Sequence, residues 1–251
     1  MWKATNLPAD KHCFFGADGG NSTGFYATLN VNTKSDDERK NIEANLMVAA
    51  NHLKLNKENL HLLNQGVSAN VEYVEKASWD EMWADGVVTD KPNIALCIRT
   101  ADCAPVLMAD YKNEVIGAAH AGWRGAFAGV IENTVNLMLQ KGAAVENIVA
   151  AVGPCIGKES YEVDEIFYAQ FVKQNDDFAK YFNAGRKGHY WFDLESFCVA
   201  KLKSCRIKNI ECSRIDTYKE TQKYYSFRRF THQNLVKKPK CFPTELSAIV
   251  L

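Results

Sequence analysis

The chain alternates between short apolar runs and longer stretches in which apolar residues recur at helical spacing. Two apolar runs, residues 106–108 and 115–119, flank the polar segment 110–114, and this pattern predicts a hairpin of two buried strands. Similar runs bounded by turn residues predict one or two strands within 60–74 and further strands at 84–90, 94–98, 148–152, 210–215 and 246–251.

Four other stretches show helical spacing. The first opens with Ser35-Asp36-Asp37-Glu38, which matches a capping box, and continues with apolar residues at positions 42, 46, 49, 50 and 53. A second helix is predicted from Phe127 to Met138, closed by Lys141-Gly142, and two more begin near residues 161–164 and 193–195. The polar stretch 173–188 receives no prediction.

The size and charge of the chain limit its domain number and the classes of partner that it can bind. The chain has 251 residues, 47% of them apolar, and no Ser/Gly/Pro-rich linker, so we expect one domain spanning residues 1–251. Its 30 basic residues balance 30 acidic residues, which gives no electrostatic footprint for nucleic acid or for an anionic membrane. The one dense basic cluster, Lys237-Lys238-Pro239-Lys240, is predicted to be a solvated loop.

The first residues of the chain lack the apolar core of a signal peptide, and no apolar run is long enough to cross a bilayer. We therefore expect a cytoplasmic protein. The eight cysteines include no CxxC pair, and in a reducing compartment they should be mostly free thiols. A functional cysteine would have to be distinguished by its neighbours.

A glycine-rich stretch between residues 12 and 30 has too many glycines for a helix and no strand–helix context for a dinucleotide loop. We expect a turn between short strands. Such a turn could bring backbone N–H groups near a ligand.

The strongest candidate chemistry lies at the two ends of the predicted hairpin. The hairpin could bring Cys103, in Thr100-Ala101-Asp102-Cys103, close to His120, in His120-Ala121-Gly122-Trp123-Arg124-Gly125. Such a pair serves either as soft metal ligands or as a nucleophile with its base, and in the second case Asp102 or a backbone carbonyl would orient the imidazole. The alternative is a buried thiol and a hydrogen-bonded core histidine.

Two arginine motifs are candidate anion sites. His120 and Arg124 are predicted to lie just before a helix N-terminus, where free N–H groups favour an anion, with Gly125 shaping the pocket. Arg228, next to Ser226, is a second candidate for anion binding, although adjacent arginines beside aromatic residues are also common at surfaces.

Seven segments, taken together and in this order, resemble the YfiH/laccase-domain family. They are Gly19-Gly20-x-Ser22-x-Gly24-x-Tyr26-x-x-Leu29-Asn30, Ala84-Asp85-Gly86-Val87-Val88-Thr89, Thr100-Ala101-Asp102-Cys103, His120-Ala121-Gly122-Trp123-Arg124-Gly125, Gly153-Pro154-Cys155-Ile156-Gly157, Tyr161-Glu162-Val163 and Ser226-Phe227-Arg228-Arg229. Members of this family were long called multicopper polyphenol oxidases and are now described as purine nucleoside phosphorylases with adenosine deaminase activity. The resemblance implies an α/β (α+β) single-domain sandwich, with mixed β-sheets and flanking helices. It also implies a nucleoside and phosphate as partners, and we expect a monomer.

The resemblance also implies a metal, usually zinc, or copper. The family's ligands are the His of a Gln-Val-His-Gly motif, the Cys of Thr-Ala-Asp-Cys and the His of His-Ala-Gly-Trp-Arg-Gly. Cys103 and His120 match the last two, but the first motif is replaced by Gln65-Gly66-Val67-Ser68. Because Val67 stands in place of a ligand, we expect this chain to bind zinc or copper weakly.

Two further departures fall on the same predicted site. Ala17 replaces an arginine expected to face substrate or phosphate, and the family's Thr-Gly-Arg after the double arginine is replaced by Gln233-Asn234-Leu235 and an insertion through about Phe242. Together with Val67, these losses suggest altered or weakened family chemistry.

Three hypotheses follow. The first is a metal-assisted purine nucleoside enzyme that carries out nucleoside phosphorolysis, adenosine deamination or both. The second is a metal-free thiol hydrolase or deamidase that uses Cys103 and His120, since the family fold is distantly similar to the cysteine deamidase domain of cytotoxic necrotizing toxins. The third is a non-catalytic binder or a member that edits peptidoglycan precursors, as some relatives are described.

Overall fold

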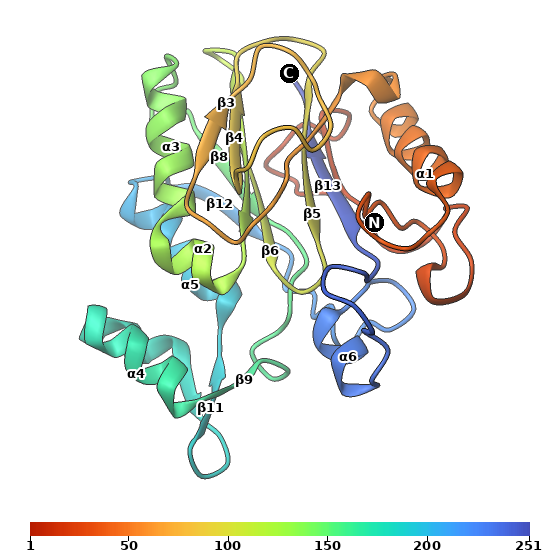
Figure 1. Cartoon of the computed structure of the whole chain (residues 1–251). Helices are drawn as coiled ribbons and strands as arrows, with labels where there is room; N and C mark the ends of the chain where they lie inside the picture. Colours follow the sequence, from red (N-terminus) through yellow and green to blue (C-terminus); the bar gives the residue numbers. More distant parts are fainter.

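The computed structural model describes residues 1–251 and contains three β-sheets (Figure 1). The largest sheet has six strands in the order β12 (Asn209–Cys212), β8 (Val149–Val152), β6 (Ala104–Asp110), β7 (Val115–Ala121), β4 (Gly86–Thr89) and β3 (Val71–Tyr73). The predicted hairpin is confirmed as β6 and β7, whose register pairs Pro105 with His120. The outer pairs β12–β8 and β4–β3 are parallel and the inner pairs are antiparallel, so the sheet is mixed.

The second sheet has four strands in the order β1 (His12–Phe14), β13 (Glu245–Ile249), β5 (Ala95–Thr100) and β2 (Leu60–Leu62). Strand β13 lies antiparallel between β1 and β5, so the last strand of the chain is built into the interior of this sheet. Strand β2 pairs parallel with β5 at the other edge.

Six α-helices and three short 3-10 helices accompany the sheets. They are α1 (Arg39–His52), α2 (Trp123–Ala128), α3 (Val130–Gln140), α4 (Glu165–Gln174), α5 (Leu194–Ser204), α6 (Phe227–His232), η1 (Gly24–Tyr26), η2 (Lys57–Asn59) and η3 (Asp176–Tyr181). No helix of the chain combines the length and the apolar character needed to span a bilayer.

The two large sheets stack because successive side chains of their strands point into different cores. On β6, Val106 and Met108 pack with residues of α3 and α5, whereas Leu107 on the opposite face packs against Leu96 and Ile98 of β5. Helix α1 covers the outer face of the four-stranded sheet, on the other side of the molecule from α3 (Figure 1). The chain is an α/β sandwich of mixed sheets with flanking helices, as the family resemblance implied.

A third sheet lies in and around the stretch for which the sequence allowed no prediction. It consists of β10 (Phe182–Ala184), β11 (His189–Phe192) and β9 (Glu162–Asp164). Aromatic packing joins it to the main body: the ring of Phe171 in α4 lies 5.0 Å from that of Phe192 and 5.3 Å from that of Phe197 in α5. Close aromatic contacts of this kind stabilise beyond simple burial, so the aromatic cluster attaches the third sheet and α4 beneath α2 and α5.

Two helix predictions were wrong in detail. The helix expected over 127–138 is divided into α2 and α3 at Gly129, whose φ of +99° lies in the left-handed region that suits glycine. The capping box before α1 is not formed: Glu38 occupies the N-cap without a side-chain bond, and the Ser35 hydroxyl donates to the Asn32 carbonyl.

The glycine-rich stretch has a structural role. Its Gly20 packs so closely on the following chain that an added Cβ would lie 2.2 Å from the Thr28 carbonyl oxygen. The buried Asn45 side chain of α1 accepts a hydrogen bond from the Asn21 N–H and donates to the Thr28 and Asn30 carbonyls. The loop is therefore tied to α1.

Candidate functional site

The site begins where the chain crosses from one large sheet to the other. Strand β5 ends at Thr100 in the four-stranded sheet and β6 starts at Ala104 in the six-stranded sheet, so residues 101–103 span the gap. Within this crossing Asp102 adopts a φ of +84° and is buried. The crossing therefore needs strong local anchors, because the left-handed region is costly for a residue with a side chain.

The carboxylate of Asp102 supplies these anchors. It accepts hydrogen bonds from Thr217 Oγ1 at 2.7 Å, from Ser226 Oγ at 2.9 Å and from the Arg228 N–H at 2.7 Å. Burial raises the pKa of Asp102, while these hydrogen bonds oppose the rise. Asp102 thus joins the crossing to the start of α6, and it does not have the predicted role of orienting His120.

Cys103 is the cysteine that the crossing presents to solvent. Cys103 is partly exposed. A Cβ added to Gly122, the residue that follows β7, would lie 2.9 Å from the Cys103 sulfur, so the glycine makes room for the thiol. Cys97 and Cys198, by contrast, are fully buried, and burial raises the pKa of Cys97 to about 12. Of these three free thiols, only Cys103 is placed for chemistry.

His120, on β7, is held by a carboxylate that the sequence reasoning did not single out. Its Nδ1 lies 2.7 Å from Asp85 Oδ1, and its backbone N–H donates to the Asp85 carbonyl. The other ring nitrogen is left for Cys103, the second side-chain partner of the imidazole. The only earlier signal for Asp85 was its place in the Ala84-Asp85-Gly86 motif of the family resemblance.

The charges of His120 and Asp85 are strongly coupled. Burial alone would lower the pKa of His120, but the adjacent Cys103 and the hydrogen-bonded Asp85 raise it to about 10. Burial alone would raise the pKa of Asp85, but hydrogen bonds from His120 and Ser68 lower it to about 2. The imidazole is consequently a cation paired with a carboxylate at neutral pH.

Asp85 also positions the loop that carries Val67. Its carboxylate accepts hydrogen bonds from the N–H groups of Gly66, Val67 and Ser68 at 3.2, 3.0 and 2.6 Å. Val67 has a φ of +61°, which is an outlier for a β-branched residue. Its Cγ1 and the Cys103 sulfur both approach the space above Gly122, at 3.2 and 2.9 Å from the position of an added Cβ, so Val67 stands beside the thiol.

These residues surround a cavity of about 590 Å³, a size that suits a small-molecule ligand. Cys103, His120, Asp102, Arg124 and Arg228 all line it, together with Val67. The structure therefore brings the predicted thiol, imidazole and two arginines to one space.

The other two predicted site residues lie behind the cavity wall. Ser226 is fully buried. Its hydroxyl donates a hydrogen bond to Asp102 and accepts one from the Arg229 N–H, so Ser226 is the N-cap of α6. Gly125 is also buried, and an added Cβ would lie 2.8 Å from the Ser68 carbonyl oxygen. Both support the shape of the site, and the expectation that they contact an anion is corrected.

The two arginines reach the cavity from different elements. Arg124 is the second residue of α2 and its guanidinium lies 4.4 Å from the Trp123 ring. Arg228 donates to the Glu162 carbonyl at 2.8 Å and lies over the Tyr161 ring. The predicted placement just before a helix N-terminus is confirmed for His120, which is near the end of β7 and three residues before α2, but it was wrong for Arg124, which lies in the first turn of α2. The anion-binding capacity lies in the side chains, since α2 is a short helix.

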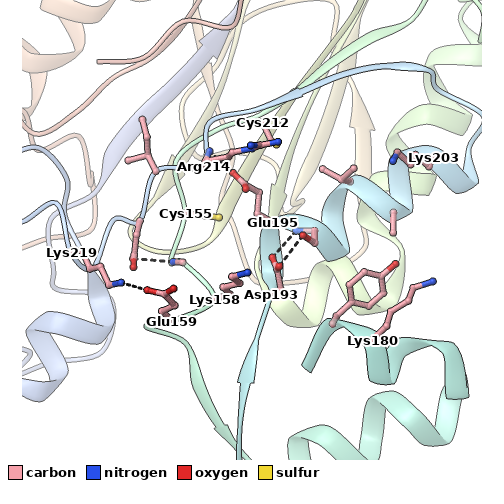
Figure 2. Close-up of a pocket in the computed structure, with 17 residues that line it drawn as sticks. Cys155, Lys158, Glu159, Lys180, Asp193, Glu195, Lys203, Cys212, Arg214 and Lys219 are labelled. Carbon is pink, nitrogen blue, oxygen red and sulfur yellow. Dashed lines mark hydrogen bonds and ion pairs between the residues drawn. The ribbon is translucent and has the colours of Figure 1, made fainter. Parts of the chain in front are cut away.

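A larger hollow of about 1020 Å³ lies beside the start of α5, and Cys155 and Gly157 are part of its lining (Figure 2). Its acidic side chains have partners: Glu159 pairs with Lys219, Glu195 accepts the Arg214 N–H, and Asp193 caps α5. It contains none of the predicted catalytic or anion-binding residues, so the smaller cavity is the candidate site.

The donors at the candidate site do not fit a catalytic zinc shell, which uses three protein ligands and an open position. Cys103 and His120 supply two donors and Val67 supplies none. No group of three or more His, Cys, Asp and Glu side chains in the chain is placed to hold a metal ion. Neither His12 nor His61 replaces the missing ligand: His12 is hydrogen-bonded to Pro8, His61 lies buried in β2, and neither residue lines the cavity.

We predict that Asp85→Asn will destabilise the fold by about 3 kcal/mol, because it leaves a buried imidazolium without its counter-charge. The pKa of His120 is raised, so its contribution is complete below about pH 6.5 and is lost as pH rises through about 10. The pKa of Asp85 is lowered, so its contribution is present above about pH 3.8 and is lost as pH falls through about 2. Urea denaturation of both proteins should therefore show the largest difference between about pH 4 and 6.5.

The matched control is Asp90→Asn, because Asp90 directly follows β4 and Asp85 directly precedes it. The Asp90 side chain is partly exposed, pairs with Lys91 and accepts a hydrogen bond from the Tyr73 hydroxyl, so its replacement should cost about 1 kcal/mol. An equal effect of the two substitutions, or a difference that grows above pH 10, would contradict the assigned ion pair.

We predict that Val67→His will raise zinc affinity by at least about 10 to 100-fold, because it adds a third donor beside Cys103 and His120. Histidine also tolerates a positive φ better than valine does. Zinc content after dialysis against graded chelator measures the change, and Asn70→His, an exposed position on the same loop, is the control. Equally tight zinc in the parent chain and the Val67→His variant would show that another group completes the shell.

Comparison with known proteins places the site in a family context. The family model described as multi-copper polyphenol oxidoreductase laccase matches residues 11–235. A purine nucleoside phosphorylase of Rickettsia prowazekii is 36% identical over 211 residues, covering 84% of this chain and 85% of the relative. A purine nucleoside phosphorylase of Deinococcus radiodurans is 43% identical over 171 residues, covering 68% of this chain and 66% of the relative.

Solved structures agree with the sequence relatives. The Bacillus licheniformis hypothetical protein YfiH superposes with a TM-score of 0.86 at 26% identity, covering 96% of this chain and 92% of that one. A Neisseria meningitidis protein of the DUF152 family superposes with a TM-score of 0.85 at 27% identity, covering 99% and 97%. The chain therefore belongs to the laccase-like YfiH/DUF152 family, which includes proteins named purine nucleoside phosphorylase.

Proposed function

We propose that this protein is a purine nucleoside phosphorylase, which uses phosphate to split a purine nucleoside into free base and ribose 1-phosphate. The names of its relatives support a purine nucleoside substrate. The observation that carries the proposal is the shared cavity in which a cationic His120 lies with Arg124 and Arg228. Phosphorolysis needs an acid for the leaving base and a cationic site for phosphate, and these side chains meet both needs.

The roles follow from the charges. Arg124 and Arg228 hold the phosphate, whose oxygen attacks C1′ of the ribose while the bond from C1′ to the purine N9 breaks. The electron pair of that bond goes to the purine, which takes a proton from His120. Asp85 keeps the imidazole oriented and protonated before the step, and solvent returns the proton afterwards.

No step is assigned to a metal, because the chain offers two of the three donors that a catalytic zinc requires. Adenosine deamination, the other activity that the family resemblance implied, would release ammonia and leave the sugar attached. The two reactions are therefore separated by their products.

We predict that incubation with inosine or adenosine and phosphate will yield free base and ribose 1-phosphate, measured by chromatography with an ammonia assay in parallel. Arg124→Gln should raise the KM for phosphate by about tenfold or more, since a charged hydrogen bond contributes about 1.5–3 kcal/mol. Arg39→Gln, on the exposed start of α1, is the control. Ammonia without free base would indicate deamination, and no product of either kind would refute a nucleoside enzyme.

The order Asp85, His120, Cys103 supports a second candidate, a metal-free thiol hydrolase. In such enzymes a carboxylate orients an imidazole that in turn contacts the nucleophilic thiol. Here Asp85 contacts Nδ1 and Cys103 is the other side-chain partner of the ring. The arrangement is the same whichever of the two reactions the cavity serves, so a chemical test must separate them.

For this candidate we expect iodoacetamide to modify Cys103 faster than Cys205 and Cys212, which are also partly exposed but have no imidazole partner. Burial raises the pKa of both comparison thiols. Mass spectrometry after brief treatment with an activated ester should then find the acyl group on Cys103. Modification of the three cysteines at equal rates, with no acyl adduct, would eliminate the thiol hydrolase.

A further inference from the structure

One wall of the candidate cavity carries two lysines from opposite ends of the chain. Lys34 and Lys240 both line the cavity, together with Asn32. The buried Asn32 amide ties the two segments together: its Oδ1 accepts the Lys34 N–H at 3.0 Å, and its Nδ2 donates to the Lys240 carbonyl at 2.8 Å. The basic cluster that includes Lys240 is an exposed loop, as predicted, and Lys240 also lines the cavity.

Both ammonium groups lie close to one indole ring. Lys34 Nζ is 5.0 Å and Lys240 Nζ is 5.3 Å from the centre of the Trp83 ring, within cation–π range. Trp83 is 61% exposed, so it forms the rim beside the cavity. An indole face attracts each cation but leaves their mutual repulsion uncompensated.

The neighbouring carboxylates are committed to other cations. Asp80 pairs with Arg99, and Asp36 pairs with Lys238 at 2.7 Å. Burial lowers the pKa of Lys34, Asp80 opposes this change, and the charges of Lys240 and Arg99 lower it further. Lys34 Nζ donates to the neutral Asn64 Oδ1, and neither Lys34 nor Lys240 is paired with a carboxylate, so the lysine pair is a cationic group in the cavity wall without a protein counter-ion.

We propose that Lys34 and Lys240 bind a phosphate group carried by the substrate, so that the preferred substrate is a purine nucleoside monophosphate. The inference rests on the proposed function, in which Arg124 and Arg228 hold the attacking phosphate. Phosphorolysis of a plain nucleoside brings one phosphate to the cavity, whereas the cavity has two cationic groups. A substrate that carries its own phosphate uses both.

Binding measured by calorimetry tests the proposal separately from turnover. The probes are AMP, adenosine, IMP, inosine and inorganic phosphate, added to the full chain. We expect AMP to bind at least about tenfold more tightly than adenosine, and IMP than inosine, because two charged contacts are added. Lys34→Met and Lys240→Met, which keep the aliphatic stems, should each remove most of this preference.

The control is Lys237→Met, in the same loop as Lys240 but outside the cavity lining. It should retain the preference for the monophosphate, and circular dichroism should show that all three variants are folded. If a lysine variant is unfolded, the affinities of the parent chain for AMP and for adenosine are measured at increasing salt concentration instead. A preference for AMP that weakens with salt supports the subsite.

The remaining outcomes are distinct. Equal affinity for AMP and adenosine, or a preference that survives both lysine substitutions, overturns the subsite. Loss of inorganic phosphate binding in the lysine variants, without any preference for AMP, would assign the pair to free phosphate and also overturns it. A lysine-dependent preference for AMP without turnover keeps the subsite and rejects phosphorolysis, whereas phosphorolysis of inosine without a preference for IMP does the reverse.

Discussion

The site depends on the crossing of the chain between two stacked sheets at residues 101–103. This crossing places a residue with a positive φ, Asp102, in the interior, and a buried carboxylate is tolerated only where hydrogen bonds replace water. Thr217, Ser226 and the Arg228 N–H provide those bonds. The same contacts fix where α6 begins, so Cys103 and Arg228 reach the cavity from one anchoring point.

A second buried carboxylate, Asp85, sets the electrostatic character of the cavity. It binds the imidazole of His120 from one side and the backbone of residues 66–68 from the other. A loop held in this way would present a metal ligand accurately, yet the residue that it presents is Val67. The side chain that this loop places beside the imidazole of His120 and the thiol of Cys103 is therefore apolar.

The cavity is also unusually cationic for a chain with no net charge. Arg124 belongs to α2 and Arg228 to α6, whereas Lys34 and Lys240 lie in loops. The acidic residue of the lining, Asp102, accepts hydrogen bonds from Thr217 and Ser226. Low-dielectric walls strengthen the field of such groups. Positive charge is therefore concentrated around this cavity, although the chain as a whole has no net charge.

The sequence by itself determined the local elements and the central pair. Period-two and apolar patterns predicted the β6–β7 hairpin, and a hairpin brings Cys103 to His120 through contacts between neighbours in the chain. The family resemblance supplied the layered fold. Tertiary structure alone decided that Asp85 rather than Asp102 holds the imidazole, that Ser226 lies behind the wall, and that Lys34 meets Lys240. These outcomes depend on how separate strands and loops pack across two sheets, and local periodicity carries no information about pairings between distant segments.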